Sequence, residues 1–141
     1  MTASRAARVA YRWIAWLFVA CVVVQFFLAG LGVFAGADNF ATHRDFGYTF
    51  GWLLVILLIL SLVGRMPGRA IGAAVLLIVL FALQSVLVAL RDSLPAVAAL
   101  HPLNGVAIFM LGLWTARSAA SWAKRTAEKP AEPVAAAEAA R

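Results

Sequence analysis

The chain has 141 residues, of which 65% are hydrophobic and 13% are charged, whereas soluble globular domains hold about 45–50% apolar and about 25% charged residues. This balance excludes an ordinary soluble domain and indicates an integral membrane protein whose main partner is the lipid bilayer. The net charge of +6 comes without a basic stripe interleaved with aromatic residues, so nucleic acid is not an expected partner.

Four apolar segments each approach the roughly 20 residues that a membrane-spanning helix needs. In chain order, the predicted spans are residues 13–35, 40–63, 70–90 and 98–122. Because unpaired backbone groups cannot be left in lipid, these spans should be helices, and short links should pack them as one bundle. The prediction is an all-α integral membrane four-helix bundle, up-down-up-down, over residues 1–125, followed by a disordered Ala/Glu/Pro-rich cytoplasmic tail over 126–141.

The basic residues indicate the orientation of the bundle. Most of them fall in the N-terminal segment, in the link between the second and third spans, and at the C-terminal end. By the positive-inside rule, both termini should be cytoplasmic and the protein should lie in the cell membrane. The first apolar run is longer than the core of a signal peptide, so we expect an uncleaved helix. Aromatic residues at the cytoplasmic ends predict an interfacial belt made of Tyr11, Trp13, Trp16 and Trp122.

A faint internal repeat relates the two halves of the predicted bundle. In each half a glutamine is followed by two leucines at intervals of three, and then by a histidine that precedes a glycine by four residues. The corresponding residues are Gln25, Leu28, Leu31, His43 and Gly47 in the first half, and Gln84, Leu87, Leu90, His101 and Gly105 in the second. The repeat predicts two parallel helical hairpins related by an axis along the membrane normal.

The two histidines, His43 and His101, fall near the outer ends of the second and fourth spans, which lie diagonally across such a bundle. With adjacent helix axes about 10 Å apart, the diagonal is roughly 14 Å, so two inward imidazoles at one depth would meet a single metal. Zinc wants about four ligands, and no cysteine or carboxylate cluster accompanies the pair. A porphyrin brings four nitrogens of its own, so the candidate cofactor is haem b with His43 and His101 as axial iron ligands.

Four neighbouring residues are candidates for contacting the haem. Gly47 and Gly105 lie one turn from the histidines and would leave a bare helix face for a flat macrocycle. The outer arginines, Arg44 and Arg91, would neutralise the propionates through charge-assisted hydrogen bonds. Equally, the glycines are typical helix-packing contacts and each arginine precedes an aspartate, so both pairs also fit ordinary packing and solvated ion pairs.

Gln25 and Gln84 are costly in lipid unless they face the bundle. Their first interpretation is interhelical hydrogen bonding, to each other, to Asn104 or to Ser85, and the second is that they line the ligand cavity. Pro102 within the fourth helix would bend it around His101. The histidines themselves also fit a role as interfacial anchors with a wet ring tip.

The sequence shows no acid–base or nucleophilic constellation, so it does not predict an enzyme. No charged residue lies in the apolar heart of a span, which argues against a pump or an ion-coupled transporter.

The segments "HRDFGYTFGWLL" and "LHPLNGVAIFMLGL" resemble one four-helix half of the heme A synthase family over about residues 11–118. In that family each half supplies a histidine pair of this kind and one half holds a haem b, so the resemblance implies ligand roles for His43 and His101 alone. The chain departs from the family by having four helices and one pair, and by lacking an acidic outer-loop residue, so haem A synthesis is not implied. The sequence also resembles short four-helix bacterial membrane proteins of unknown function.

Three functions remain open. The first is a small membrane protein that binds one haem b near the outer face for electron transfer or haem handling. The alternative is a cofactor-free structural or accessory subunit of a larger membrane complex, or a homodimer, in which Gly47-x-x-x-Gly51 and Gly32-x-x-x-Gly36 are the sensitive faces. A quinone or lipid carrier that uses the glutamines is a third, less specific interpretation.

Overall fold

A computed structural model describes residues 2–128, with side chains up to Lys124. Over this range the chain is helical and contains no strand. The helices are α1 (Ala3–Phe34), α2 (Asn39–Val63), α3 (Gly68–Ala89), the short α4 (Pro95–Ala98) and α5 (His101–Glu128). Four of them are long and apolar enough to cross a membrane, so the predicted all-α four-helix membrane architecture is confirmed.

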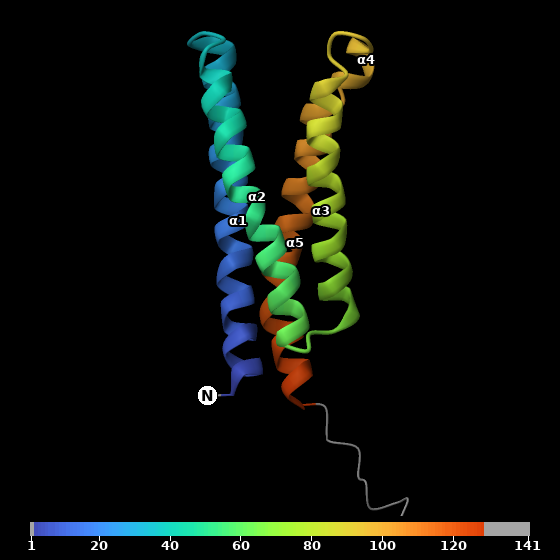
Figure 1. The fold of residues 1–141 in the computed structure, drawn as a ribbon. Coiled ribbons are helices and arrows are strands. Elements are labelled where there is room, and N and C mark those ends of the chain that lie inside the picture. The colour runs from blue at the N-terminus through green and yellow to red at the C-terminus, as the bar shows by residue number, and fades with distance from the viewer. Residues whose placement is uncertain (1, 129–141) are drawn as a thin grey trace, which may run out of the picture.

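The four long helices alternate in direction (Figure 1), so the N-terminus and the end of α5 lie at the same end of the bundle. α1 packs against α2 and α5, and α3 also packs against α2 and α5. α2 and α5 therefore face each other diagonally. Figure 1 also shows that the α1–α2 hairpin and the α3–α5 hairpin diverge toward the end that carries the α1–α2 turn and α4. We call this the open end and the opposite one the closed end.

The side chains on the outside of the bundle are apolar along its length. Phe27 is 64% exposed, Trp52 69% and Leu103 65%, which would be unfavourable in water and suits hydrocarbon. α1 alone has 32 residues, or about 48 Å at 1.5 Å per residue, against roughly 30 Å of hydrocarbon. Its first turns, which carry basic residues, therefore extend beyond the bilayer core. The protein is thus a multi-pass membrane protein.

The buried core is concentrated in the closed half of the bundle. Most core residues come from the first half of α1, the second half of α2, the first half of α3 and the second half of α5, and they include Tyr11, Phe18, Leu54, Leu57, Ala70, Ala74, Leu77, Ala116 and Ala119. The alanines let helix backbones approach closely, as small residues do in membrane bundles. The closed end is therefore tightly packed, and the histidines lie outside that core.

The turn between α2 and α3 fixes the closed end. α2 ends at Val63 with Gly64 as its C-cap, and Arg65 then takes a left-handed conformation with φ of 50°. The Met66 amide donates to the Ser61 carbonyl at 2.9 Å. The Arg8 guanidinium of α1 donates to the Gly64 carbonyl at 3.3 Å. This contact ties the first turns of α1 to the end of the first hairpin.

Several sequence expectations need correction at the helix ends. α1 begins at Ala3, ten residues before the predicted span, and residues 126–128 continue α5 instead of opening a tail. The rest of the predicted tail, 129–141, lies outside the described residues. Pro102 is the second residue of α5, where its missing N–H has no helical partner to lose, so it does not bend the helix.

The predicted interfacial belt is wrong for two of its four residues. Trp13 and Trp16 point outward, with 64% and 38% exposure, whereas Tyr11 and Trp122 are buried. The Tyr11 hydroxyl donates to the Ala70 carbonyl at 3.4 Å. Tyr11 therefore connects α1 to α3 across the closed end and does not anchor the bundle to the headgroups.

Candidate functional site

The two histidines meet in the open half of the bundle. His43 lies in the second turn of α2 and His101 is the first residue of α5, and these helices are diagonal to each other. The two imidazole ring centres are 6.2 Å apart and the ring planes are inclined by 63°. Both side chains are half-buried. The structure thus brings together, from opposite hairpins, the two histidines that occupy equivalent positions in the sequence repeat.

His43 is held by Gln25 of α1 through three polar contacts. The His43 Nδ1 lies 3.1 Å from the Gln25 carbonyl oxygen, and because a carbonyl only accepts, this nitrogen carries the ring proton. The Gln25 amide nitrogen donates to the His43 carbonyl at 2.8 Å and lies 3.3 Å from His43 Nε2. This network assigns a neutral imidazole with its lone pair on Nε2, the form that binds metals.

His101 is held in the same way by Gln84 of α3. Its Nδ1 lies 3.3 Å from the Gln84 carbonyl oxygen, so its lone pair is also on Nε2. The Gln84 side chain turns to Asn104, whose amide nitrogen donates to Gln84 Oε1 at 2.8 Å and to the Leu80 carbonyl at 2.8 Å. A carbonyl partner on Nδ1 that fixes ring orientation is typical of histidines that bind metals.

The two glycines make room for the glutamine side chains. A Cβ at Gly47 would lie 2.9 Å from the Gln25 amide nitrogen, and one at Gly105 would lie 3.3 Å from that of Gln84. The helix faces at Gly47 and Gly105, which were predicted to be free for a macrocycle, are thus covered by the glutamine amides. The two halves also match in three dimensions. In each half, the side-chain amide of the glutamine lies against the glycine, and the backbone carbonyl of the same glutamine accepts from the histidine Nδ1.

The outer arginines lie at the surface. Arg44 pairs with Asp45 at 2.9 Å and Arg91 with Asp92 at 3.6 Å. All four side chains are mainly exposed, and the Arg44 guanidinium contacts no other helix through a polar bond among the described residues. The geometry agrees with the solvated-pair interpretation and leaves both arginines at the rim of the open end.

Aromatic side chains form a floor beneath the histidines. The Phe50 ring lies 5.3 Å from both the Phe46 and the Phe81 rings, and the Phe26 ring lies 6.1 Å from that of Phe109. Such edge-to-face and tilted pairs stabilise the packing of these rings against one another. Sequence reasoning missed this layer, although the phenylalanines of "RDFGYTFGW" at helical spacing were its visible signal.

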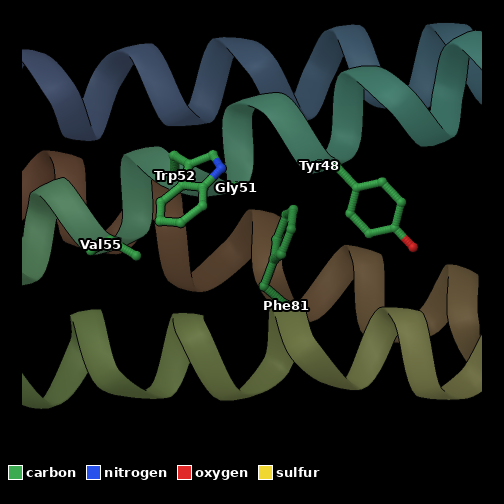
Figure 2. Close-up of a pocket in the computed structure, with 5 residues that line it drawn as sticks. All are labelled: Tyr48, Gly51, Trp52, Val55 and Phe81. Atoms are coloured by element: carbon green, nitrogen blue, oxygen red, sulfur yellow. The ribbon is translucent and has the colours of Figure 1, made fainter.

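A groove opens beside this floor, between α2 and α3. It has a volume of about 320 Å³ and is lined by Tyr48, Gly51, Trp52, Val55 and Phe81. Figure 2 shows the Phe81 ring projecting from α3 toward α2, with Tyr48 on one side and Trp52 on the other. A Cβ at Gly51 would lie 2.7 Å from the Phe81 ring. The groove was not predicted, because it depends on one ring that crosses between hairpins.

The candidate site can hold a metal only through a small number of protein ligands. Within residues 2–128, no group of three or more His, Cys, Asp or Glu side chains is placed to bind a metal ion. Cys21 is in the middle of α1 and is not part of the histidine cluster. The available donor set is therefore two imidazole nitrogens, which suits a metal that brings a macrocycle with it and does not suit a bare zinc ion.

Comparison with known proteins gives a family without an assigned activity. Residues 25–90 match the model of a family of unknown function, DUF6220. The chain is similar to that family over just under half its length, a segment that includes Gln25, His43 and Gln84 but ends before His101. No curated protein and no solved structure matches the chain. Since the family description names no activity, any function rests on the geometry of the site.

Proposed function

We propose that the protein is a small integral membrane protein that binds one haem b through His43 and His101, for electron transfer or haem handling. The observation that carries the proposal is the 6.2 Å separation of the two ring centres. A metal–imidazole bond of about 2.0–2.1 Å would put each ring centre about 3 Å from the metal, so two imidazoles that held one metal would have ring centres about 6 Å apart. The observed edge-to-face separation of 6.2 Å is close to this distance and supports the proposal.

The protein's own residues would orient and shield the ligands. The Gln25 and Gln84 carbonyls accept hydrogen bonds from the two Nδ1 atoms, which would fix the ring orientations and leave each Nε2 as the ligand atom. The apolar rings of the phenylalanine floor would lower the local dielectric on one side of the ligands. When bound, haem iron supplies a one-electron redox centre.

Room for the macrocycle would come from side-chain movement in the open half. The Gln25 and Gln84 amides lie over Gly47 and Gly105, and moving them away would expose the two glycine faces. Gln25 Oε1 is buried and has no hydrogen-bond partner among the described residues, so the present position of this amide is incompletely satisfied. The exposed ion pairs of Arg44 and Arg91 contribute little, so either arginine would exchange its aspartate for a propionate readily.

The positive-inside rule supports a location for the site. The basic N-terminal turns and the Arg65–Arg69 link are at the closed end, and the histidines are toward the open end. The proposal therefore places both termini in the cytoplasm of a cell-membrane protein and the haem near its outer face. The resemblance of the segments around both histidines to one half of the heme A synthase family agrees in ligand type; haem A synthesis is not part of the proposal.

The test is a reduced-minus-oxidised absorbance spectrum of the detergent-purified protein, produced with added haem precursor. The wild type should show a six-coordinate b-type spectrum, and His43→Ala and His101→Ala should each lose it. Thr42→Ala and Leu103→Ala, which alter exposed neighbours on the same two helices, serve as matched controls and should keep it. All variants should elute as monodisperse helical protein.

A colourless wild type with sound helical content, or an unchanged spectrum in both histidine variants, would refute haem ligation. In that case the cofactor-free accessory subunit becomes the better reading. Co-purification of a stable membrane partner, lost on Gly51→Leu, would support it.

A further inference from the structure

The groove between α2 and α3 faces the surroundings of the bundle. It has a volume of about 320 Å³ and is lined by Tyr48, Gly51, Trp52, Val55 and Phe81. Tyr48 is 60% exposed and Trp52 69%, so the aromatic walls of the groove are open on their outer side. Around a membrane-spanning segment the surroundings are lipid chains.

Gly51 creates the space between the two helices. A Cβ at this position would lie 2.7 Å from the Phe81 ring. The repeat-related residue in α5 is Phe109, whose ring packs 6.1 Å from that of Phe26 on α1. The repeat thus has a large side chain between α5 and α1 but a glycine between α2 and α3, and the glycine leaves the groove open.

A pair of opposite charges lies at the open-end side of the groove. Arg44 is one turn from Tyr48 on the same face of α2, and Figure 2 shows the Tyr48 hydroxyl pointing away from Trp52. The Arg44 Nε donates to the Asp45 carboxylate at 2.9 Å. These two side chains make no other hydrogen bond among the described residues. The remaining guanidinium N–H groups therefore suit a phosphate, and the second carboxylate oxygen suits a cationic donor.

The distance from the charged pair to the far end of the groove matches one lipid leaflet. From Arg44 to Val55, α2 rises about 16 Å at 1.5 Å per residue, and half of the hydrocarbon core is about 15 Å. A lipid with its headgroup at Arg44 and Asp45 therefore has an acyl chain along the groove. Because the pair carries both signs, it complements a headgroup that contains a phosphate and an ammonium. A purely anionic headgroup has no cation for Asp45.

We propose that the groove binds one phosphatidylethanolamine molecule from the leaflet at the open end. Its phosphate contacts Arg44, its ammonium contacts Asp45, and one acyl chain lies between α2 and α3. The ammonium has N–H groups that donate to a carboxylate, as those of lysine do, whereas a choline headgroup has none. Tyr48 lies between the headgroup and the chain, the level at which tyrosines are enriched in membrane proteins. Lipid binding at this surface does not depend on haem.

The test is quenching of tryptophan fluorescence by lipids with brominated acyl chains. The full-length protein is reconstituted in phosphatidylcholine vesicles that contain an equal minor fraction of brominated phosphatidylethanolamine, phosphatidylglycerol or phosphatidylcholine. The difference between wild type and Trp52→Phe isolates the signal from the groove. This signal should show phosphatidylethanolamine binding about threefold to tenfold more tightly than phosphatidylcholine, the gain expected from one hydrogen bond. Phosphatidylglycerol should bind no more tightly than phosphatidylcholine.

Asp45→Asn tests the headgroup contact without touching the packed core. The neutral amide no longer attracts the ammonium, so the ratio of phosphatidylethanolamine to phosphatidylcholine binding should fall to about one. Asp92→Asn is the matched control, because Asp92 pairs with Arg91 at 3.6 Å in the segment after α3. This variant should keep the wild-type ratio.

Four outcomes would overturn the proposal. Equal quenching of Trp52 by all three lipids would show ordinary solvation of the bundle by the bilayer. Strongest quenching by phosphatidylglycerol would show an anionic-lipid site instead. A preference that survives Asp45→Asn, or that Asp92→Asn also removes, would exclude the Arg44–Asp45 pair as the headgroup site. A preference that is equally large in Trp52→Phe would place the lipid on another face of the bundle.

Discussion

Gly47→Ala tests the contact between the Gln25 amide and α2. A Cβ at this position would lie 2.9 Å from Gln25 Nε2, so the amide must retreat and lengthen its 2.8 Å bond to the His43 carbonyl and its contact with Nε2. Two hydrogen bonds of about 0.5–1.5 kcal/mol each are worth about 1–3 kcal/mol. Alanine has a higher helix propensity than glycine, which stabilises the folded state by about 1 kcal/mol. The free energy of unfolding should therefore fall by about 0–2 kcal/mol in total.

The assay is reversible unfolding in mixed detergent micelles, followed by circular dichroism. Gly72→Ala is the control, because a Cβ there meets nothing within 4 Å and only the gain of up to about 1 kcal/mol applies. The two variants should therefore differ by about 1–3 kcal/mol in free energy of unfolding. If Gly47→Ala proves as stable as Gly72→Ala, the Gln25 amide does not occupy the glycine face and the derived network around His43 is wrong.

Two further substitutions probe neighbouring contacts by the same unfolding assay. Gly51→Ala puts a Cβ 2.7 Å from the Phe81 ring, and this overpacking should cost about 1–3 kcal/mol and shift the fluorescence of Trp52 in the groove; an unchanged emission would show that the ring does not cross there. Asn104→Leu removes the donor to Gln84 Oε1, and the unsatisfied, partly buried acceptor should cost about 1 kcal/mol; a neutral result would mean that this acceptor finds another donor.

The helical architecture could be predicted from the sequence because lipid leaves the backbone few alternatives. α2 and α3 begin and end within two residues of the predicted spans. The start of α1 could not be found in this way, because the segment before Trp13 lies outside the apolar run and forms helix from alanine and arginine, both good helix formers. The burial of Tyr11 and Trp122 depends on which helix packs beside them, and hydropathy carries no information about that.

The candidate site was predictable at the level of residue identity. Two histidines in matching repeat positions, each with a glutamine upstream, do meet in space as the diagonal geometry requires. The sequence could not predict that Gly47 and Gly105 make room for glutamine amides, because the rotamer of each glutamine decides what lies against the glycine. The groove beside Phe81 likewise depends on contact between hairpins that are distant in sequence. Gln25 and Gln84 both bond across helices, in line with the first sequence interpretation, whereas their lining of a ligand cavity stays a prediction.

The buried side chains are distributed unevenly, so the closed and open ends of the bundle differ in how firmly the helices are held together. Alanine-lined contacts and the Tyr11–Ala70 bond join all four long helices at the closed end, whereas few buried apolar residues hold the hairpins together at the other. Separating the hairpins at the open end therefore sacrifices little buried area, and local opening costs far less free energy than global unfolding. Separation of the two hairpins at the open end would therefore leave the packing of the closed end intact.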